Sequence, residues 1–275
     1  YHDRKQRKSS SILVLSPNSV FSDYISHILP ELGEENIREM SLDLFAYREL
    51  KKIVPDCEDR YHQIEHRLSG MDEADWKRCQ WKQSRDCIGA MEGFLAQLEE
   101  WLVNLKGVHF RGLEKTEEEM IRLFYFKFQE VPVLARMGAI MEYFVDEYET
   151  RYSTELSEEE VEKLRTKFNA LYTTVDVYKI YNWFLEEQGL PLLPDVPYDR
   201  RYLSYEDVYP MLYLKYRLEG AGRQDQIRHL VVDEMQDYSY LQYTILSLLF
   251  SCPMTILGDR AQTMEEEQND VTQFL

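Results

Sequence analysis

The chain has 275 residues, of which 44% are hydrophobic and 13% aromatic, so it can build one large core or two smaller ones, and a disordered tail is excluded. Its 32 Lys and Arg oppose 50 Asp and Glu, and the net charge of -18 excludes a surface that binds phosphates over its whole area. No segment approaches the roughly 20 apolar residues of a membrane span, and the first residues show neither an initiator Met nor a signal peptide. We therefore expect a soluble intracellular fragment. The four cysteines form no C-x-x-C pair, which indicates neither a zinc knuckle nor a disulfide framework.

The first predicted element is a strand. Residues 12–15 (ILVL) form a short continuous apolar run, which is typical of a strand buried on both faces of a parallel sheet. The run is followed by Ser16, Pro17 and Asn18. Apolar residues then recur at helical spacing over residues 20–29, so this segment predicts a strand, a tight turn and a helix.

The character of the sequence changes between residues 46 and 200. Apolar residues recur there every three or four positions and no alternating strand pattern is evident, which predicts a mainly helical segment. One of its helices should begin at Ser157, because Ser157 and Glu160 have the spacing of a capping box.

This middle segment is acidic, with 21 Lys and Arg against 31 Asp and Glu. The acids concentrate between Glu142 and Glu162, where nine of them accompany the single base Arg151. Such a pattern fits a solvated helix face or a binding surface for a partner.

Strand and helix patterns return after residue 200. A helix capped at Ser204 should run to Gly220, and residues 229–232 and 254–257 read as strands around a helix over 240–250. Strands therefore alternate with helices at both ends of the chain and not in the middle. This arrangement predicts an α/β domain interrupted by a large, mainly α-helical insertion.

Adjacent carboxylates follow the strand at 229–232. Asp233 and Glu234 should lie at the carboxyl edge of a parallel sheet, where open α/β folds bind their ligands. Asp233 there suits Mg²⁺, and Glu234 suits the orientation or deprotonation of an attacking water, as phosphoryl hydrolysis requires. A bare Asp-Glu pair also fits an ordinary acidic loop.

Further residues extend this pattern. The acidic pair opens a DE-x-QD tetrad, and the strand at 254–257 is followed by Gly258-Asp259-x-x-Gln262. Together they resemble motifs II and III of superfamily 1 helicases of the UvrD/Rep type, and residues 12–33 resemble motif Ia of the HelD, or helicase IV-like, branch. The resemblance implies that the sheet is part of a P-loop (RecA-like) motor domain in which the three predicted strands lie side by side. It also implies a bacterial cytoplasmic protein.

The resemblance carries roles onto matching residues. It assigns Asp233 to Mg²⁺, Glu234 to the catalytic base and Gln262 to sensing the γ-phosphate of ATP. Gln236 and Asp237 would couple the nucleotide to motif III, and Asp259 would complete the nucleotide site. Single-stranded nucleic acid would contact the segment that follows the first strand, namely Ser16, Pro17 and Asn18.

Two departures limit what the chain itself is expected to do. It has no G-x-x-x-x-G-K-[ST] motif, and the nearest segment, residues 107–112, is followed by Leu113 and Glu114 instead of a lysine. It also has no counterpart of the second motor domain with its arginine fingers. We therefore expect a fragment from motif Ia to motif III that is inactive alone, with motor parts at 1–45 and 201–275 and an insertion domain at 46–200.

A competing motif lies within the middle segment. His62-x-x-Glu65-His66 matches the inverted zinc-peptidase pattern, with both histidines on one helix face. The same five residues also fit a charged, solvated helix, and no third zinc ligand is evident in the sequence.

The favoured function is therefore that of a HelD-like ATPase or translocase, which would use ATP and Mg²⁺ to act on RNA polymerase and its bound nucleic acid. The alternatives are a DNA-unwinding repair helicase of the UvrD/Rep type and a non-catalytic helical interaction module. Because a repair helicase should offer basic surface to duplex DNA, the net acidic middle segment favours a protein partner, or displacement of nucleic acid by a like-charged surface. The resemblance to the HelD branch implies that this partner is RNA polymerase.

Overall fold

The computed structural model describes residues 12–16 and 37–258, and these residues form two compact units. Unit 1 comprises the described residues up to Gly89, Leu193–Tyr213 and those from Ala221 onward, and unit 2 comprises Ala90–Leu192 and Leu214–Gly220. The expected helix over 20–29 lies outside the described residues, as do Pro17, Asn18, Asp259 and Gln262. None of the described helices is both long enough and apolar enough to cross a membrane.

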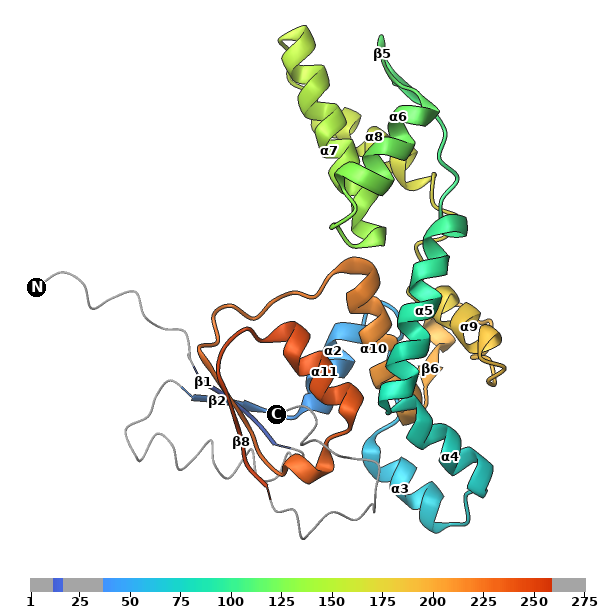
Figure 1. The fold of residues 1–275 in the computed structure, drawn as a ribbon, viewed down its shortest axis with the longest axis vertical. Helices are drawn as coiled ribbons and strands as arrows, with labels where there is room; N and C mark the ends of the chain where they lie inside the picture. The colour runs from blue at the N-terminus through green and yellow to red at the C-terminus, as the bar shows by residue number, and fades with distance from the viewer. Residues whose placement is uncertain (1–11, 17–36, 259–275) are drawn as a thin grey trace, which may run out of the picture. The chain divides into compact units, whose positions relative to one another are not determined.

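Unit 1 is built on a parallel four-stranded sheet with the order β2-β1-β7-β8 (Figure 1). Its strands are β1 (Ile12–Leu15), β2 (Ile37–Met40), β7 (His229–Val232) and β8 (Met254–Ile256). The expectation that the three predicted strands lie side by side is confirmed, since β7 lies between β1 and β8. Burial alternates along β1 and β7, so the prediction of full burial on both strand faces was wrong.

Helices and short elements complete unit 1. They are α2 (Leu42–Leu50), β3 (Asp56–Cys57), α3 (Arg60–Leu68), α4 (Glu73–Lys82), η2 (Tyr198–Arg200), β6 (Tyr202–Leu203), η3 (Met235–Asp237) and α11 (Tyr240–Leu249). Two helices contribute residues to both units, namely α5 (Arg85–Leu102) and α10 (Tyr205–Glu219). Most of these helices begin at a residue whose side chain accepts a backbone N–H, as Ser41 does for Leu44 and Ser239 for Gln242.

Unit 2 is mainly helical, as the sequence predicts. Its remaining elements are β4 (Val108–Phe110), β5 (Leu113–Lys115), α6 (Glu117–Arg122), η1 (Leu123–Lys127), α7 (Val133–Tyr152), α8 (Glu158–Asn169) and α9 (Val177–Glu187). The predicted capping box is present, because Ser157 accepts the N–H of Glu160 and the Glu160 carboxylate accepts the N–H of Ser157. The cores of α7 and α8 meet where the rings of Phe144 and Phe168 lie edge to face, 5.6 Å apart.

Short strands within the middle segment were not predicted. β4 and β5 form an antiparallel hairpin whose turn residues Arg111 and Gly112 both have positive φ, as a two-residue hairpin turn requires. The segment whose sequence came nearest to a phosphate loop, residues 107–112, therefore contains the first strand and the turn of this hairpin. The predicted domain boundaries at 45 and 200 stay a prediction, and residues 46–89 belong to unit 1 together with the sheet.

Candidate active site

The acidic segment follows β7 at the carboxyl edge of the sheet. The backbone N–H of Asp233 donates to the carbonyl of Leu15 at 2.9 Å, which fixes the end of β7 against β1. All four strands are parallel, so the residues that follow them meet at the same edge, including Ser16 after β1 and Ser41 after β2. Both serines are buried. The sheet therefore brings the predicted Mg²⁺ ligand to the edge where open α/β folds bind ligands.

The six residues from Asp233 to Tyr238, here called the acidic turn, are held by internal hydrogen bonds. Asp233 Oδ1 accepts the N–H of Glu234 at 3.0 Å, and Gln236 Nε2 donates to Glu234 Oε2 at 2.5 Å. The N–H of Asp237 donates to the carbonyl of Glu234 at 2.9 Å. Glu234 itself has φ of 52°, a left-handed conformation that is uncommon for a residue with a side chain. The turn thus presents the exposed Glu234 carboxylate in a fixed, strained geometry.

The end of β8 lies directly against the acidic turn. The N–H of Met235 donates to the carbonyl of Leu257 at 2.9 Å, and the N–H of Leu257 donates to the carbonyl of Val232 at 2.8 Å. A Cβ atom added to Gly258 would lie 2.8 Å from the backbone nitrogen of Met235, so this position requires glycine. The structure therefore places Gly258, the first residue of the second motif, directly against the acidic turn. The roles predicted for Asp259 and Gln262 concern residues outside the described part of the chain.

The acidic turn fits one way of holding Mg²⁺. This ion is usually bound through one or two carboxylates together with water and substrate phosphates. Asp233 at the strand end is suited to supply such a carboxylate. Among the described residues, no group of three His, Cys, Asp or Glu side chains is arranged to enclose a metal.

The histidines of the competing zinc motif pair with neighbouring acids. His62 Nδ1 lies 2.9 Å from Asp59 Oδ2, and His66 Nδ1 lies 3.4 Å from Glu58 Oε1. The hydrogen bond that the His62 ring donates to the Asp59 carboxylate raises the pKa of His62. The three residues of the motif are exposed on α3, so the local geometry favours the solvated helix over a peptidase site.

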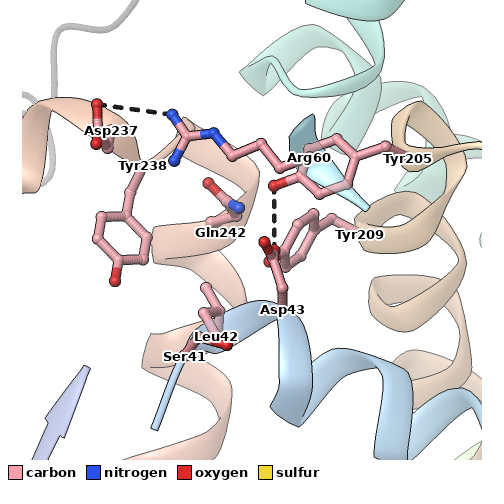
Figure 2. A pocket seen from close by; sticks show the side chains of 9 residues that line it. All are labelled: Ser41, Leu42, Asp43, Arg60, Tyr205, Tyr209, Asp237, Tyr238 and Gln242. Atoms are coloured by element: carbon pink, nitrogen blue, oxygen red, sulfur yellow. Dashed lines mark hydrogen bonds and ion pairs between the residues drawn. The ribbon is translucent and has the colours of Figure 1, made fainter. Parts of the chain in front are cut away.

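A polar cluster lines a small pocket beside the acidic turn, and the sequence did not predict it (Figure 2). The hydroxyls of Tyr205 and Tyr209 both donate to the carboxylate of Asp43, at 3.1 Å from Tyr205. Burial raises the pKa of Asp43 despite these two hydrogen bonds. Arg60 reaches Asp237 at the end of the acidic turn, with a guanidinium nitrogen 3.6 Å from Asp237 Oδ1. The cluster joins α2, α3 and α10 to the turn.

A second buried cluster connects α4 to the start of α10. Lys82 Nζ lies 2.9 Å from Glu206 Oε1 and 2.6 Å from Asp207 Oδ1, and all three residues are buried. Burial alone would raise the pKa of Glu206, but the Lys82 charge and hydrogen bonds from neighbouring donors outweigh it, so the pKa is lowered. Arg78 adds a further contact to Glu206 at 3.1 Å. Within unit 1, this cluster therefore joins the end of α4 to the start of α10.

Comparison with known protein families agrees with the geometry of the site. The family model described as the UvrD/REP helicase N-terminal domain matches residues 45–264, which is most of the chain. The chain belongs to this family. The predicted membership of superfamily 1 is therefore confirmed, and membership implies an ATP-dependent helicase that uses Mg²⁺ and binds nucleic acid. No curated protein matches the chain.

Proposed function

We propose that this UvrD/REP-type domain supplies the carboxylate side of an ATPase site in a HelD-type translocase, which acts on RNA polymerase and its bound nucleic acid in the bacterial cytoplasm. The observation that carries the ATPase part is the acidic turn, held at the carboxyl edge of a parallel sheet and backed by the end of β8. ATP and Mg²⁺ would supply the phosphoryl group and the charge that neutralises its oxygens.

Within this site the residues divide the work by position. Asp233 is the proposed Mg²⁺ ligand, because it directly follows β7 and its backbone is anchored to β1. Glu234 is the proposed base that takes a proton from the attacking water. Gln236 donates to the Glu234 carboxylate at 2.5 Å and so restricts its orientation. Asp237 closes the turn through its N–H, and the family resemblance supports a coupling role for both Gln236 and Asp237.

The proposal of an RNA polymerase partner is supported by the charge of unit 2. This unit contains 13 Lys and Arg against 21 Asp and Glu, a net charge of -8. Several of its acidic side chains on and around α7 and α8 are exposed, namely Glu142, Asp146, Glu155, Glu158, Glu159 and Glu162. An acidic surface repels the phosphates of duplex DNA and attracts the basic lining of a channel that normally holds nucleic acid.

The exposure of each acidic residue decides which ones are suitable for charge reversal. Glu160 lies in the first turn of α8, where it is partly buried, closes the capping box and contacts Arg111. Charge reversal at Glu160 would therefore disturb α8 itself. Glu142 and Asp146 are better choices, because they are exposed one turn apart within α7 and cap no helix.

The experiment uses the full-length parent protein. We expect Glu142→Lys with Asp146→Lys to weaken its association with RNA polymerase, to reduce the salt dependence of that association, and to leave ATP hydrolysis unchanged. Arg165→Glu is the matched control, because it changes charge on an exposed position of α8 in the opposite direction. Tight duplex binding with efficient unwinding, and no association with polymerase, would instead support the UvrD/Rep-type repair helicase. A parent without ATP hydrolysis would support a non-catalytic interaction module.

A further inference from the structure

Two helices whose sequence carries no helicase motif support the acidic turn from outside the sheet: α3 contacts the turn itself, and the C-cap residue of α4 contacts the residues that directly follow it. Arg60, the first residue of α3, forms an ion pair with Asp237, which a dashed line marks in Figure 2. The guanidinium nitrogen lies 3.6 Å from Asp237 Oδ1. The Arg60 side chain is about one-third exposed, and that of Asp237 somewhat more so. A contact of this exposure adds little to stability by itself. Its position at the end of the acidic turn is what makes it informative.

Gln83, which caps the end of α4, makes three contacts with the segments on either side. Its Oε1 accepts the hydroxyl of Ser239 at 3.2 Å, and its backbone carbonyl accepts the N–H of Leu241 at 3.2 Å. Its Nε2 donates to the carbonyl of Glu206 at 3.2 Å. Ser239 caps α11 and directly follows the acidic turn. Gln83 therefore fixes the point where the turn becomes a helix.

The third of these contacts replaces a backbone hydrogen bond that α10 lacks. Pro210 lies inside α10 and has no N–H, so the carbonyl of Glu206, four residues earlier, loses its helical donor. The Gln83 amide supplies a donor to that same carbonyl. One side chain thus connects the proline-interrupted turn of α10 to the start of α11.

The left-handed conformation of Glu234 depends on how the acidic turn is held at both ends. Glu234 has φ of 52°, and such a left-handed conformation persists in a residue with a side chain only where its surroundings determine it. The acidic turn is anchored by the sheet at Asp233 and Met235, and its far end is held by Arg60 at Asp237 and by Gln83 at Ser239. Loss of the far anchors would let the turn relax without unfolding the sheet.

We propose that Arg60 and Gln83 are positioning residues for ATP hydrolysis, which hold the acidic turn in its strained form and so make α3 and α4 a control element of turnover. This inference rests on the proposed ATPase function of the turn. Neither residue needs to touch the nucleotide, because both act through the backbone that carries Glu234 and Gln236. Misplacement of a reacting group by about 1 Å can cost up to ~100-fold in rate.

The test measures steady-state ATP hydrolysis by the full-length parent. We expect Arg60→Ala to lower kcat by roughly tenfold while KM for ATP changes less than about twofold, since the contact orients the turn and does not bind ATP. Arg60→Lys should restore most of the rate, because a lysine still offers a cation to Asp237. Gln83→Ala should also lower kcat with little change in KM. Arg67→Ala is the matched control on α3, where it removes a guanidinium that lies 3.7 Å over the ring of Trp76; its kcat should stay unchanged.

A double-mutant cycle separates positioning from general stability. If Arg60 acts through Asp237, Arg60→Ala combined with Asp237→Asn should be no slower than the slower single variant. The inference would be overturned if the loss of kcat in the double variant equalled the product of the two single losses. It would also be overturned by an Arg60→Ala variant that melts at a lower temperature but retains full kcat. A wild-type parent without ATP hydrolysis would overturn the proposed function and this inference together. Normal ATP hydrolysis by the wild type, together with independent losses of kcat from Arg60→Ala and Asp237→Asn, would overturn this inference alone.

Discussion

The buried cluster around Lys82 gives the sharpest prediction for stability. Lys82→Met keeps the length and most of the volume of the side chain but removes the cation that lies 2.9 Å from Glu206 and 2.6 Å from Asp207. Two buried carboxylates then lose their shared partner. Breaking a buried pair from one side costs about 3–5 kcal/mol. We expect about 3 kcal/mol at pH 7, at the lower end of that range, because Arg78 still contacts Glu206.

The dependence of this loss on pH tests its cause. The pKa of Glu206 is lowered in the folded chain, so its contribution to stability is present above its ordinary value of 4.5 and disappears as the pH falls through the lowered folded value. Lys82→Met removes the attraction that lowers this pKa. The difference in stability between the wild type and the variant should therefore be largest near pH 7 and should shrink in acid.

Urea unfolding of the 275-residue chain, followed by tryptophan fluorescence at pH 7 and in acid, measures both effects. Trp76 and Trp81 both lie in α4, next to the cluster, and report on unit 1. Lys77→Met is the matched control, since it makes the same substitution at an exposed position of the same helix and should change stability little. A loss below about 1 kcal/mol, or one that is equal at pH 7 and in acid, would refute the assigned role of the cluster.

Three other predictions concern the acidic turn and its neighbours. Glu234→Gln should abolish ATP hydrolysis by the parent and leave nucleotide binding largely intact, because an amide keeps the shape but cannot accept the proton; filter binding and phosphate release measure the two. Gly258→Ala should destabilise the sheet edge by about 1–3 kcal/mol, seen as a lower unfolding midpoint, because its Cβ would lie 2.8 Å from the Met235 nitrogen. The 275-residue chain alone should show no steady ATP turnover, since it lacks a G-x-x-x-x-G-K motif; turnover that Glu234→Gln removes would contradict this.

Local sequence signals predicted the parts of the fold that local forces determine. The strands β1 and β7 and the capping box at Ser157 were found because an apolar run or a pair of residues three apart carries the whole signal. Strand β2 was missed because its sequence, IREM, places two charged residues in a four-residue strand. Missing β2 also hid Asp43, which lies in the first turn of the following helix.

The candidate site divides in the same way. Asp233 and Glu234 were found because two acids end an apolar strand, whereas Arg60 was not, because nothing in the sequence around it indicates a contact with Asp237. Such contacts depend on folding distant segments together, and the hydrogen bond between Gln83 and Ser239 joins residues 156 positions apart. The spacing of hydrophobic residues predicts helices and strands, but it does not predict polar contacts between distant segments.

One residue in the sequence does lie at a long-range polar contact, although only the structure identifies the partner. Pro210 lies inside α10, within the helix that the sequence predicts from Ser204 to Gly220, and proline removes a backbone donor in any helix interior. A buried carbonyl that loses its donor must find another, and here the donor is the Gln83 amide. The irregular residue therefore pointed to a long-range contact that also reaches the end of the acidic turn. Where a local rule is broken inside a buried element, the compensating side chain is a reasonable candidate for a functional link, and Gln83→Ala tests that reasoning directly.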